Sequence, residues 1–321
     1  MGERESLDLK LDFKEFPPGV KHIKVSLSSR EAAVAALTLY SPCRPRAVWM
    51  RHTAFVLLRL VGARALPGRA IRWEPPMGRE EWLDLCNQWR AQIGPFDGFA
   101  IGERAQQNRS GFFVLLLQRG RPTAFVKIRA RDAGGLAHEY AVTQRVWAAS
   151  PRSFSVPEPL ALDRRGDWHY LAVAPLTSVR HGVPRDPPLG EIASEIGDAL
   201  RDLPRHPDCP DHWVPMHGDL TPWNLRELPD RRLVLFDWED AAWAPPGADE
   251  VLYRVSNAAV GNAIPGRHAA REAVRFWADR IGARVEAGRR DEQLQRSLLR
   301  MLRLMDAPLE GATAATAGRG G

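Results

Sequence analysis

Cysteine is scarce in this chain of 321 residues, and Cys43, Cys86 and Cys209 stand far apart. An odd, scattered set of cysteines argues against a disulfide framework and indicates a reducing compartment. Long hydrophobic runs are also lacking, since the apolar run over residues 54–58 is far too short to cross a bilayer. The first 14 residues are densely charged and hold no apolar segment of the signal-peptide type. We therefore expect a cytoplasmic protein without a membrane partner.

Lysine is scarce as well, although the chain holds 45 lysines and arginines in total. The first 24 residues contain four of the five lysines: Lys10, Lys14, Lys21 and Lys24. Every later basic position is arginine except Lys127. Against such a bias, a solitary lysine indicates a place that needs a compact ammonium on a flexible stem rather than a guanidinium. Lys127 is therefore a candidate functional residue.

A concentrated basic block is also missing, although the formal net charge is +6 and the pI is about 9.6. The pI alone would favour a nucleic-acid-binding protein. Because the arginines are interleaved with acids, we prefer a basic surface and expect no nucleic-acid partner. His206, Cys209 and His212 could ligate zinc, but they lie in a Pro- and Asp-rich stretch without a second cysteine pair. A solvated loop is the preferred interpretation of that stretch.

Residues 1–95 are expected to be mostly helical, after a short strand over residues 22–27. The patterns predict helices over residues 32–39, 46–61 and 79–93, the first opened by a capping box at residues 28–31. In the second helix, Trp49, Leu57, Leu60 and Val61 recur at helical spacing, and Arg51, His52 and Arg59 lie on the opposite face. The third helix carries an apolar face, which we interpret as core packing.

From residue 96 the period of the pattern changes from helical to extended. Strands are predicted over residues 98–102, 111–118, 123–128 and 168–176, with polar turns at 103–110 and 119–122. Helices are predicted over residues 136–149, 189–203, 249–262, 267–282 and 290–305. The last residues are small and unpatterned, so a disordered tail is expected over residues 310–321.

One motif stands out in the second half of the chain: His217-Gly218-Asp219, followed by Asn224 and, after an apolar run, Asp237. The interval from Asp219 to Asn224 is that of a protein-kinase catalytic loop. A match of this kind arises by chance in roughly one such sequence in a hundred. Lys127 in a predicted strand and Glu139 in a predicted helix precede it in the order that such a loop requires.

With these residues in place, residues 96–305 resemble the aminoglycoside phosphotransferase and choline kinase family of the protein-kinase-like fold. The resemblance implies an α+β, two-lobed fold: a small antiparallel-sheet lobe over residues 96–176 and a larger, mainly helical lobe over residues 177–309. Residues 1–95 would be an N-terminal extension outside it, whose last helix could pack on the small lobe. A protein partner for the extension is an open alternative that no motif supports.

The resemblance also implies roles for the motif residues. Asp219 would be the catalytic aspartate that orients the acceptor hydroxyl, and Asn224 and Asp237 would hold Mg²⁺ on the phosphates. Lys127 would contact the α- and β-phosphates, and Glu139 would pair with it. Without that role, Glu139 would simply be an acid in the first turn of a helix.

Other residues receive weaker assignments. Ala174 and Leu176, in the connector after the last strand of the small lobe, would bind the nucleotide base through backbone groups. His217 would support the loop by hydrogen bonding, and Asp249 would be structural. Glu239 would either touch the metal shell or cap a turn. The polar turn at residues 103–110 would lie over the phosphates.

The implied function is an ATP-dependent phosphotransferase, with GTP as the alternative nucleotide and Mg²⁺ as the cofactor. The γ-phosphoryl group would pass to a hydroxyl of a small molecule: a sugar, an aminoglycoside-like compound or an amino-alcohol. The alternative is a non-catalytic, kinase-like binding module. Against that alternative stands the complete set of motif residues, because degenerate kinases usually lack at least one of them.

Overall fold

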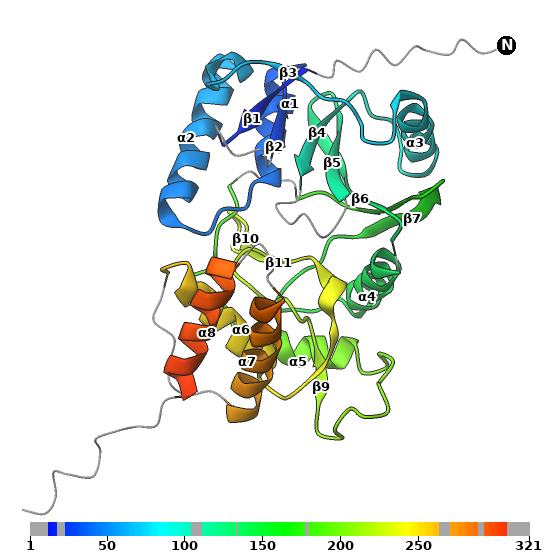
Figure 1. The fold of residues 1–321 in the computed structure, drawn as a ribbon. Coiled ribbons are helices and arrows are strands. Elements are labelled where there is room, and N and C mark those ends of the chain that lie inside the picture. Colours follow the sequence, from blue (N-terminus) through cyan, green and yellow to red (C-terminus); the bar gives the residue numbers. More distant parts are fainter. Residues whose placement is uncertain are drawn as a thin grey trace, which may run out of the picture.

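The computed structural model describes residues 12–17, 23–103, 111–132, 134–176, 180–262, 270–287 and 292–306. These residues form an α+β fold with a sheet lobe and a mainly helical lobe (Figure 1). The strands are β1 (Asp12–Phe16), β2 (Ile23–Ser26), β3 (Ile71–Arg72), β4 (Gly98–Glu103), β5 (Gly111–Gln118), β6 (Arg121–Ala130), β7 (Pro159–Arg165), β8 (Trp168–Val173), β9 (Val214–Met216), β10 (Leu225–Glu227), β11 (Leu233–Leu235) and β12 (Ala242–Ala244). The helices are α1 (Arg30–Ala36), α2 (Pro45–Val61), α3 (Arg79–Gln92), α4 (Gly135–Ala149), α5 (Leu189–Ala199), α6 (Ala248–Ala259), α7 (Arg271–Glu286) and α8 (Glu292–Asp306), with 3-10 turns η1 (Leu37–Leu39), η2 (Ala63–Ala65) and η3 (Trp238–Asp240).

The described residues of the sheet lobe form one eight-stranded sheet in the order β3-β1-β2-β4-β5-β6-β8-β7. All neighbouring strands pair antiparallel. β2 pairs with β4, so that Ile23 lies opposite Gly102 and Lys24 opposite Ile101. The predicted extension over residues 1–95 is mostly helical in its described part, yet its strands continue the sheet of the small lobe. Residue 95 therefore marks no break in the sheet.

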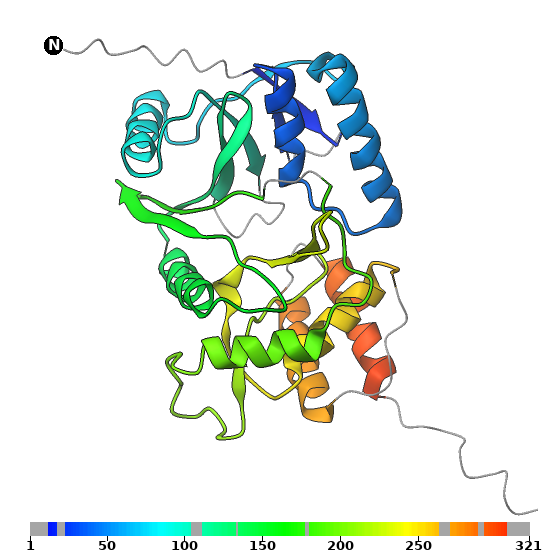
Figure 2. The same cartoon turned by 180° about the vertical axis from the view of Figure 1, so that it is seen from behind.

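Helices cover both faces of this sheet, and α2 and α3 lie on opposite sides of it in Figures 1 and 2. β5 has a continuous apolar sequence because its alternate side chains enter two different cores. Val114 and Leu116 pack with Trp82 and Trp89 of α3. On the opposite face, Leu115 and Leu117 pack with residues of α1 and α2, including Leu58. The predicted packing of the third helix on the small lobe is confirmed.

In helix α2 the predicted apolar face is exposed, and of the three residues predicted on the opposite face Arg51 is buried whereas His52 and Arg59 are exposed. Arg51 is fully buried, whereas the side chains of Trp49 and Leu60 are 71% and 69% exposed. The burial of Arg51 is possible because its guanidinium donates hydrogen bonds to the backbone carbonyls of Tyr40 and His181. The apolar stripe read from the sequence is real, but it faces outward.

In the helical lobe, α5 packs with α4 around one core, and α6, α7 and α8 share a second. Two short ladders, β9 with β12 and β10 with β11, frame the segment between β9 and β10. The predicted helices of this lobe are present, with ends shifted by a few residues. β7 was not predicted; its sequence, PLALDRR, ends in three charged residues, as suits a strand at the sheet edge. In the described part of the chain, no helix has the length and apolarity needed to cross a membrane.

Candidate active site

The loop from His217 to Asn224 is held at its start by Asp249 of α6. The carboxylate of Asp249 accepts hydrogen bonds from the backbone N–H groups of His217 (2.7 Å) and Gly218 (3.1 Å). Asp249 is 3% exposed, so these bonds supply partners for two buried backbone donors. The structure thus places Asp249 beneath the loop.

Gly218 is required by its surroundings. Its φ of +81° lies in the left-handed region, and an added Cβ would overlap the carbonyl oxygen of Asp240. We expect Gly218→Ala to lower the free energy of unfolding by at least about 2 kcal/mol, because backbone strain and steric overlap add up. Thermal or urea unfolding measures this loss. Gly282→Ala in α7 is the matched control, since its Cβ meets nothing within 4 Å and the change should be neutral or stabilising. Equal stability of the two variants would contradict this account of the loop.

The pH dependence of stability should reveal the burial of Asp249. Burial raises the pKa of Asp249 to about 6, although two N–H groups donate to its carboxylate. Between about pH 4 and pH 6 the folded chain therefore binds more protons than the unfolded chain, so this carboxyl lowers stability as the pH rises. The free energy of unfolding of the natural chain minus that of Asp249→Asn should fall by up to about 3 kcal/mol across this window and be constant above about pH 7. A difference that does not change with pH would show that the carboxyl titrates normally.

His217 lies against the ring of Trp238, with ring centroids 4.4 Å apart. Its Nδ1 accepts a hydrogen bond from the backbone N–H of Asp219 (3.1 Å). Burial lowers the pKa of His217 to about 3, so the imidazole is neutral at physiological pH. A neutral ring that accepts at Nδ1 orients the backbone of Asp219.

Asp219 and Asn224 are joined directly. Nδ2 of Asn224 donates to Oδ2 of Asp219 (2.8 Å) and to its backbone carbonyl (3.0 Å). Burial, followed by the carboxylates of Asp237 and Asp240, raises the pKa of Asp219 well above its usual value. The Asp219 side chain keeps some exposure in the described structure. The site therefore concentrates negative charge around this carboxyl and stabilises its position through the asparagine.

Lys127 of β6 connects the two lobes. It is 9% exposed and forms ion pairs with Glu139 of α4 and with Asp237, whose Oδ1 lies 2.5 Å from Nζ. Strand β6 directs Lys127 away from Val126 and Ile128, which enter the core under α3. The structure thus brings together three of the motif residues, Lys127 from β6, Glu139 from α4 and Asp237 from the segment after β11.

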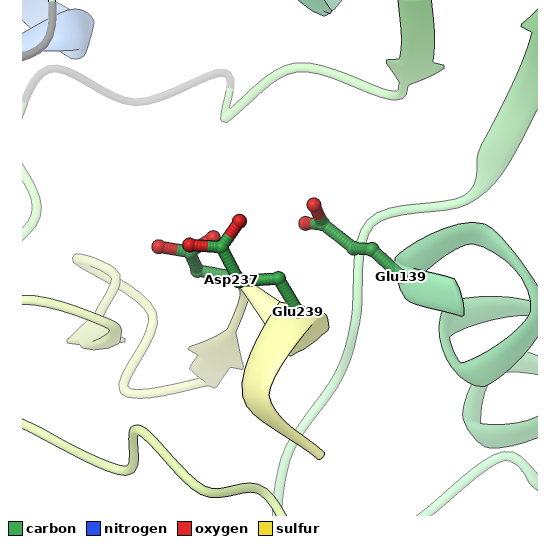
Figure 3. Close-up of side chains that lie close together, drawn as sticks. All are labelled: Glu139, Asp237 and Glu239. Carbon is green, nitrogen blue, oxygen red and sulfur yellow. The ribbon is translucent and has the colours of Figure 1, made fainter. Parts of the chain in front are cut away.

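Three carboxylates meet at this point: Glu139, Asp237 and Glu239 (Figure 3). One oxygen of each lies within 4.8 Å of the others. Oε2 of Glu139 is buried without a hydrogen-bond partner in the described structure. Arg129, two residues after Lys127 on the same strand, pairs with Glu239. The three carboxylates outnumber the two basic side chains beside them, Lys127 and Arg129, and one carboxylate oxygen has no hydrogen-bond partner in the described structure. Such a group of oxygen ligands suits a divalent cation.

The structure does not place the residues predicted to bind the nucleotide base and the phosphates as clearly as the motif residues. The backbone N–H of Ala174 donates to the carbonyl of Glu158 (2.8 Å), so it already has a protein partner. Leu176 follows in the same connector and is partly buried. Residues 104–110 of the predicted phosphate turn lie outside the described residues. Binding of the base by Ala174 and Leu176 stays a prediction.

The possible zinc ligands are not brought together in the described structure. His206 contacts Asp208 (3.4 Å), and His212 contacts Glu272 (2.9 Å). Both histidines are exposed. The group of potential metal ligands found among the described residues is instead the carboxylate cluster.

A buried arginine cluster behind the loop was missed at the level of sequence. Arg226 of β10 is fully buried, and its guanidinium donates to the carbonyls of Pro222 (3.0 Å) and Pro42 (3.3 Å). Its Nε also donates to Nδ1 of His181 (3.0 Å), the histidine whose carbonyl accepts from Arg51. Segments of the N-terminal extension, the connector and the loop from His217 to Asn224 are thereby joined. Nothing in the sequence distinguishes these arginines from the many exposed ones.

A comparison with models of protein families gave no match. A comparison with curated proteins also gave none. Similar solved structures include spectinomycin phosphotransferase in complex with ADP and spectinomycin, which is 8% identical with a TM-score of 0.45 and is matched over 70% of this chain and 94% of that chain.

Two further structures are similar. The GDP complex of aminoglycoside 2'-phosphotransferase-IIIa is 13% identical, with a TM-score of 0.46 over 70% of this chain and 97% of that chain. A choline/ethanolamine kinase family protein from Mesorhizobium loti is 14% identical, with a TM-score of 0.40 over 70% of this chain and 96% of that chain. The element order and strand order of the described residues themselves give the expected α+β fold, with an antiparallel sheet lobe and a mainly helical lobe.

Proposed function

We propose that the protein is an ATP-dependent phosphotransferase, with GTP as the alternative donor, that phosphorylates a hydroxyl of a small molecule. The observation that carries the proposal is the contact of Lys127 with both Glu139 and Asp237, next to the bonded pair of Asp219 and Asn224. Phosphoryl transfer passes through a loose transition state whose charge is spread over the phosphoryl oxygens. Catalysis therefore depends on positioning and on neutralising charge, and these residues supply both.

The proposed roles follow from these contacts. Asp219, held by the amide of Asn224, would orient the acceptor hydroxyl and take up its proton. Lys127 would contact the donor phosphates, with Glu139 fixing the direction of its side chain. His217 and Asp249 would act through the loop backbone rather than on the substrate.

Magnesium fits the carboxylate cluster. Asp237 would be its principal protein ligand, with the side-chain oxygen of Asn224 and a carboxylate oxygen of Glu239 as further candidates. The buried, unpaired Oε2 of Glu139 supports a positive charge nearby. When bound, Mg²⁺ would neutralise the charge of the phosphates. Arg129 would then orient Glu239 through their ion pair.

A ligand-binding assay provides the first test. Nucleotide binding to the folded state must raise the melting temperature, so ATP with Mg²⁺ should stabilise the chain more than ATP with EDTA. Asp237→Asn should remove most of the additional rise in melting temperature that depends on Mg²⁺. If the shift is the same with and without Mg²⁺, the metal assignment is wrong.

A turnover assay identifies the acceptor. Release of ADP from ATP, and of GDP from GTP, should be measured with sugars, aminoglycosides and amino-alcohols as acceptors. An acceptor-dependent rate that is lost in Asp219→Asn supports the proposal. Tight magnesium-dependent nucleotide binding without turnover on any acceptor would instead favour the non-catalytic binding module.

A further inference from the structure

Exposed apolar side chains are concentrated on helix α2. Nine large hydrophobic residues in the described part of the chain are exposed, and five of them lie on this helix. These five are Trp49 (71% exposed), Val56 (49%), Leu57 (42%), Leu60 (69%) and Val61 (60%). Scattered exposed hydrophobics are ordinary, but a contiguous group on one element marks an interaction surface.

The spacing of these residues makes a continuous stripe. At about 100° per residue, Trp49, Val56 and Leu60 lie within about 40° of one another, and Leu57 and Val61 flank them on one side. The stripe extends along most of a helix of 17 residues, about 25 Å long. In Figures 1 and 2, α2 lies at the outer edge of the sheet lobe, with no described element on its outer side.

Within residues 32–73, the part of the chain that contains α2, the charge has one sign. No aspartate or glutamate occurs from residue 32 to residue 73. The exposed charged residues on and beside α2 are all arginines: Arg44, Arg46, Arg59 and Arg64. The guanidinium of Arg180, from the connector, also lies over the ring of Phe55, at 5.5 Å from its centroid, and so does that of Arg59. A partner for this face must therefore be apolar at its centre and anionic at its margins.

A second copy of the chain fits this requirement poorly. A twofold contact through α2 would place the arginines of one copy against those of the other, which is unfavourable. The stripe is also a ridge on a single helix rather than a groove that would receive a peptide. An anionic phospholipid surface matches both features, since it offers an apolar interior below a layer of negative charge. A tryptophan in the stripe suits the boundary between the apolar interior and the charged layer of such a surface.

We propose that α2 docks the protein on an anionic phospholipid surface, with the helix axis parallel to the surface. Trp49, Val56 and Leu60 would enter the acyl boundary, and Arg46 and Arg59 would contact the phosphates. The absence of a long apolar run does not oppose this, because an interfacial helix needs only one apolar face. Docking through α2 leaves the catalytic loop, which lies in the other lobe, outside the contact (Figure 1).

Vesicle sedimentation with the full chain tests the proposal. Vesicles of phosphatidylcholine with phosphatidylglycerol should bind the protein, vesicles of phosphatidylcholine alone should bind it at least about tenfold more weakly, and high salt should reverse the binding. The double variant Trp49→Ser with Leu60→Ser should lower the partition coefficient at least about tenfold. Arg46→Glu with Arg59→Glu should have a similar effect.

A matched control removes exposed apolar surface elsewhere. Trp147 of α4 and Leu304 of α8 are 47% and 51% exposed, so Trp147→Ser with Leu304→Ser should keep vesicle binding unchanged. The melting temperatures of both serine variants should stay near that of the natural chain, because the side chains replaced are exposed. No binding to anionic vesicles, or equal losses in the two serine variants, would overturn the proposal. Self-association in sedimentation equilibrium that Trp49→Ser abolishes would assign the stripe to a second copy and overturn it too.

Discussion

Asp219→Asn is expected to lower kcat by about 10²–10⁴-fold while leaving the fold at least as stable as before. The loss arises because an amide cannot accept the proton of the acceptor hydroxyl. Stability should not suffer because burial and the nearby carboxylates of Asp237 and Asp240 already disfavour the charged form of Asp219. Removing a repelled carboxylate therefore relieves the folded state. Function and stability should change in opposite directions at this position.

Steady-state kinetics and thermal unfolding of the same preparation measure both effects. Asp211→Asn is a suitable control, since that carboxylate is fully exposed in the same lobe and its loss should change neither quantity. Binding of Mg²⁺ with ATP to the Asp219 variant should persist, because the change leaves Lys127 and Asp237 in place. A kcat reduced less than tenfold, or a clear fall in melting temperature, would argue against the assigned role.

Lys127→Met should reduce both activity and stability. The variant removes the ammonium from Glu139 and Asp237, so a nearly fully buried carboxylate loses its counter-charge. Removing one partner of a buried ion pair costs about 3–5 kcal/mol of folding free energy. We expect a rise in the KM for ATP and a fall of at least about 10²-fold in kcat/KM, because the charge of the phosphates is no longer neutralised by the lysine.

Two further variants separate the structural loss from the catalytic one. Lys127→Met combined with Glu139→Gln should recover part of the stability, since the glutamine needs no counter-charge, but none of the activity. Lys24 is the matched control, because it is also buried and is paired with Glu103 from a neighbouring strand of the same sheet. Lys24→Met should lower stability without changing the KM for ATP. Full activity of Lys127→Met would refute the nucleotide-binding assignment.

The candidate site could be proposed from sequence because the chemistry of such a site restricts the choice of residues. Few residue types can orient a hydroxyl or hold a metal, so Asp219, Asn224 and Asp237 are visible as a spaced pattern. Lys127 was visible for another reason, as a lone lysine in an arginine-rich chain. Arg226 and Arg129 were not identified from the sequence, because a single arginine does not stand out in a chain rich in arginine.

The orientation of α2 could not be read from its sequence. Helical periodicity defines two faces but not which of them is buried, and the apolar one is normally assigned to the core. Here the buried face holds Arg51, Ala54 and Leu58. The guanidinium of Arg51 donates to the carbonyls of Tyr40 and His181, which lie outside the helix. The pairing of β2 with β4 could not be predicted for a similar reason, because the paired residues, such as Ile23 and Gly102, are 79 positions apart and leave no local signal.

The order of strands in the sheet has a consequence for solubility. Among the described residues, the sheet ends at β3, which is only two residues long, and at β7, whose last residues are charged. Short or charged strands are poor templates for a strand from another molecule. The apolar strands β4, β5 and β6 are all interior. The N-terminal strands therefore keep β4 from being an open edge, and they protect the lobe that carries Lys127 against intermolecular sheet growth.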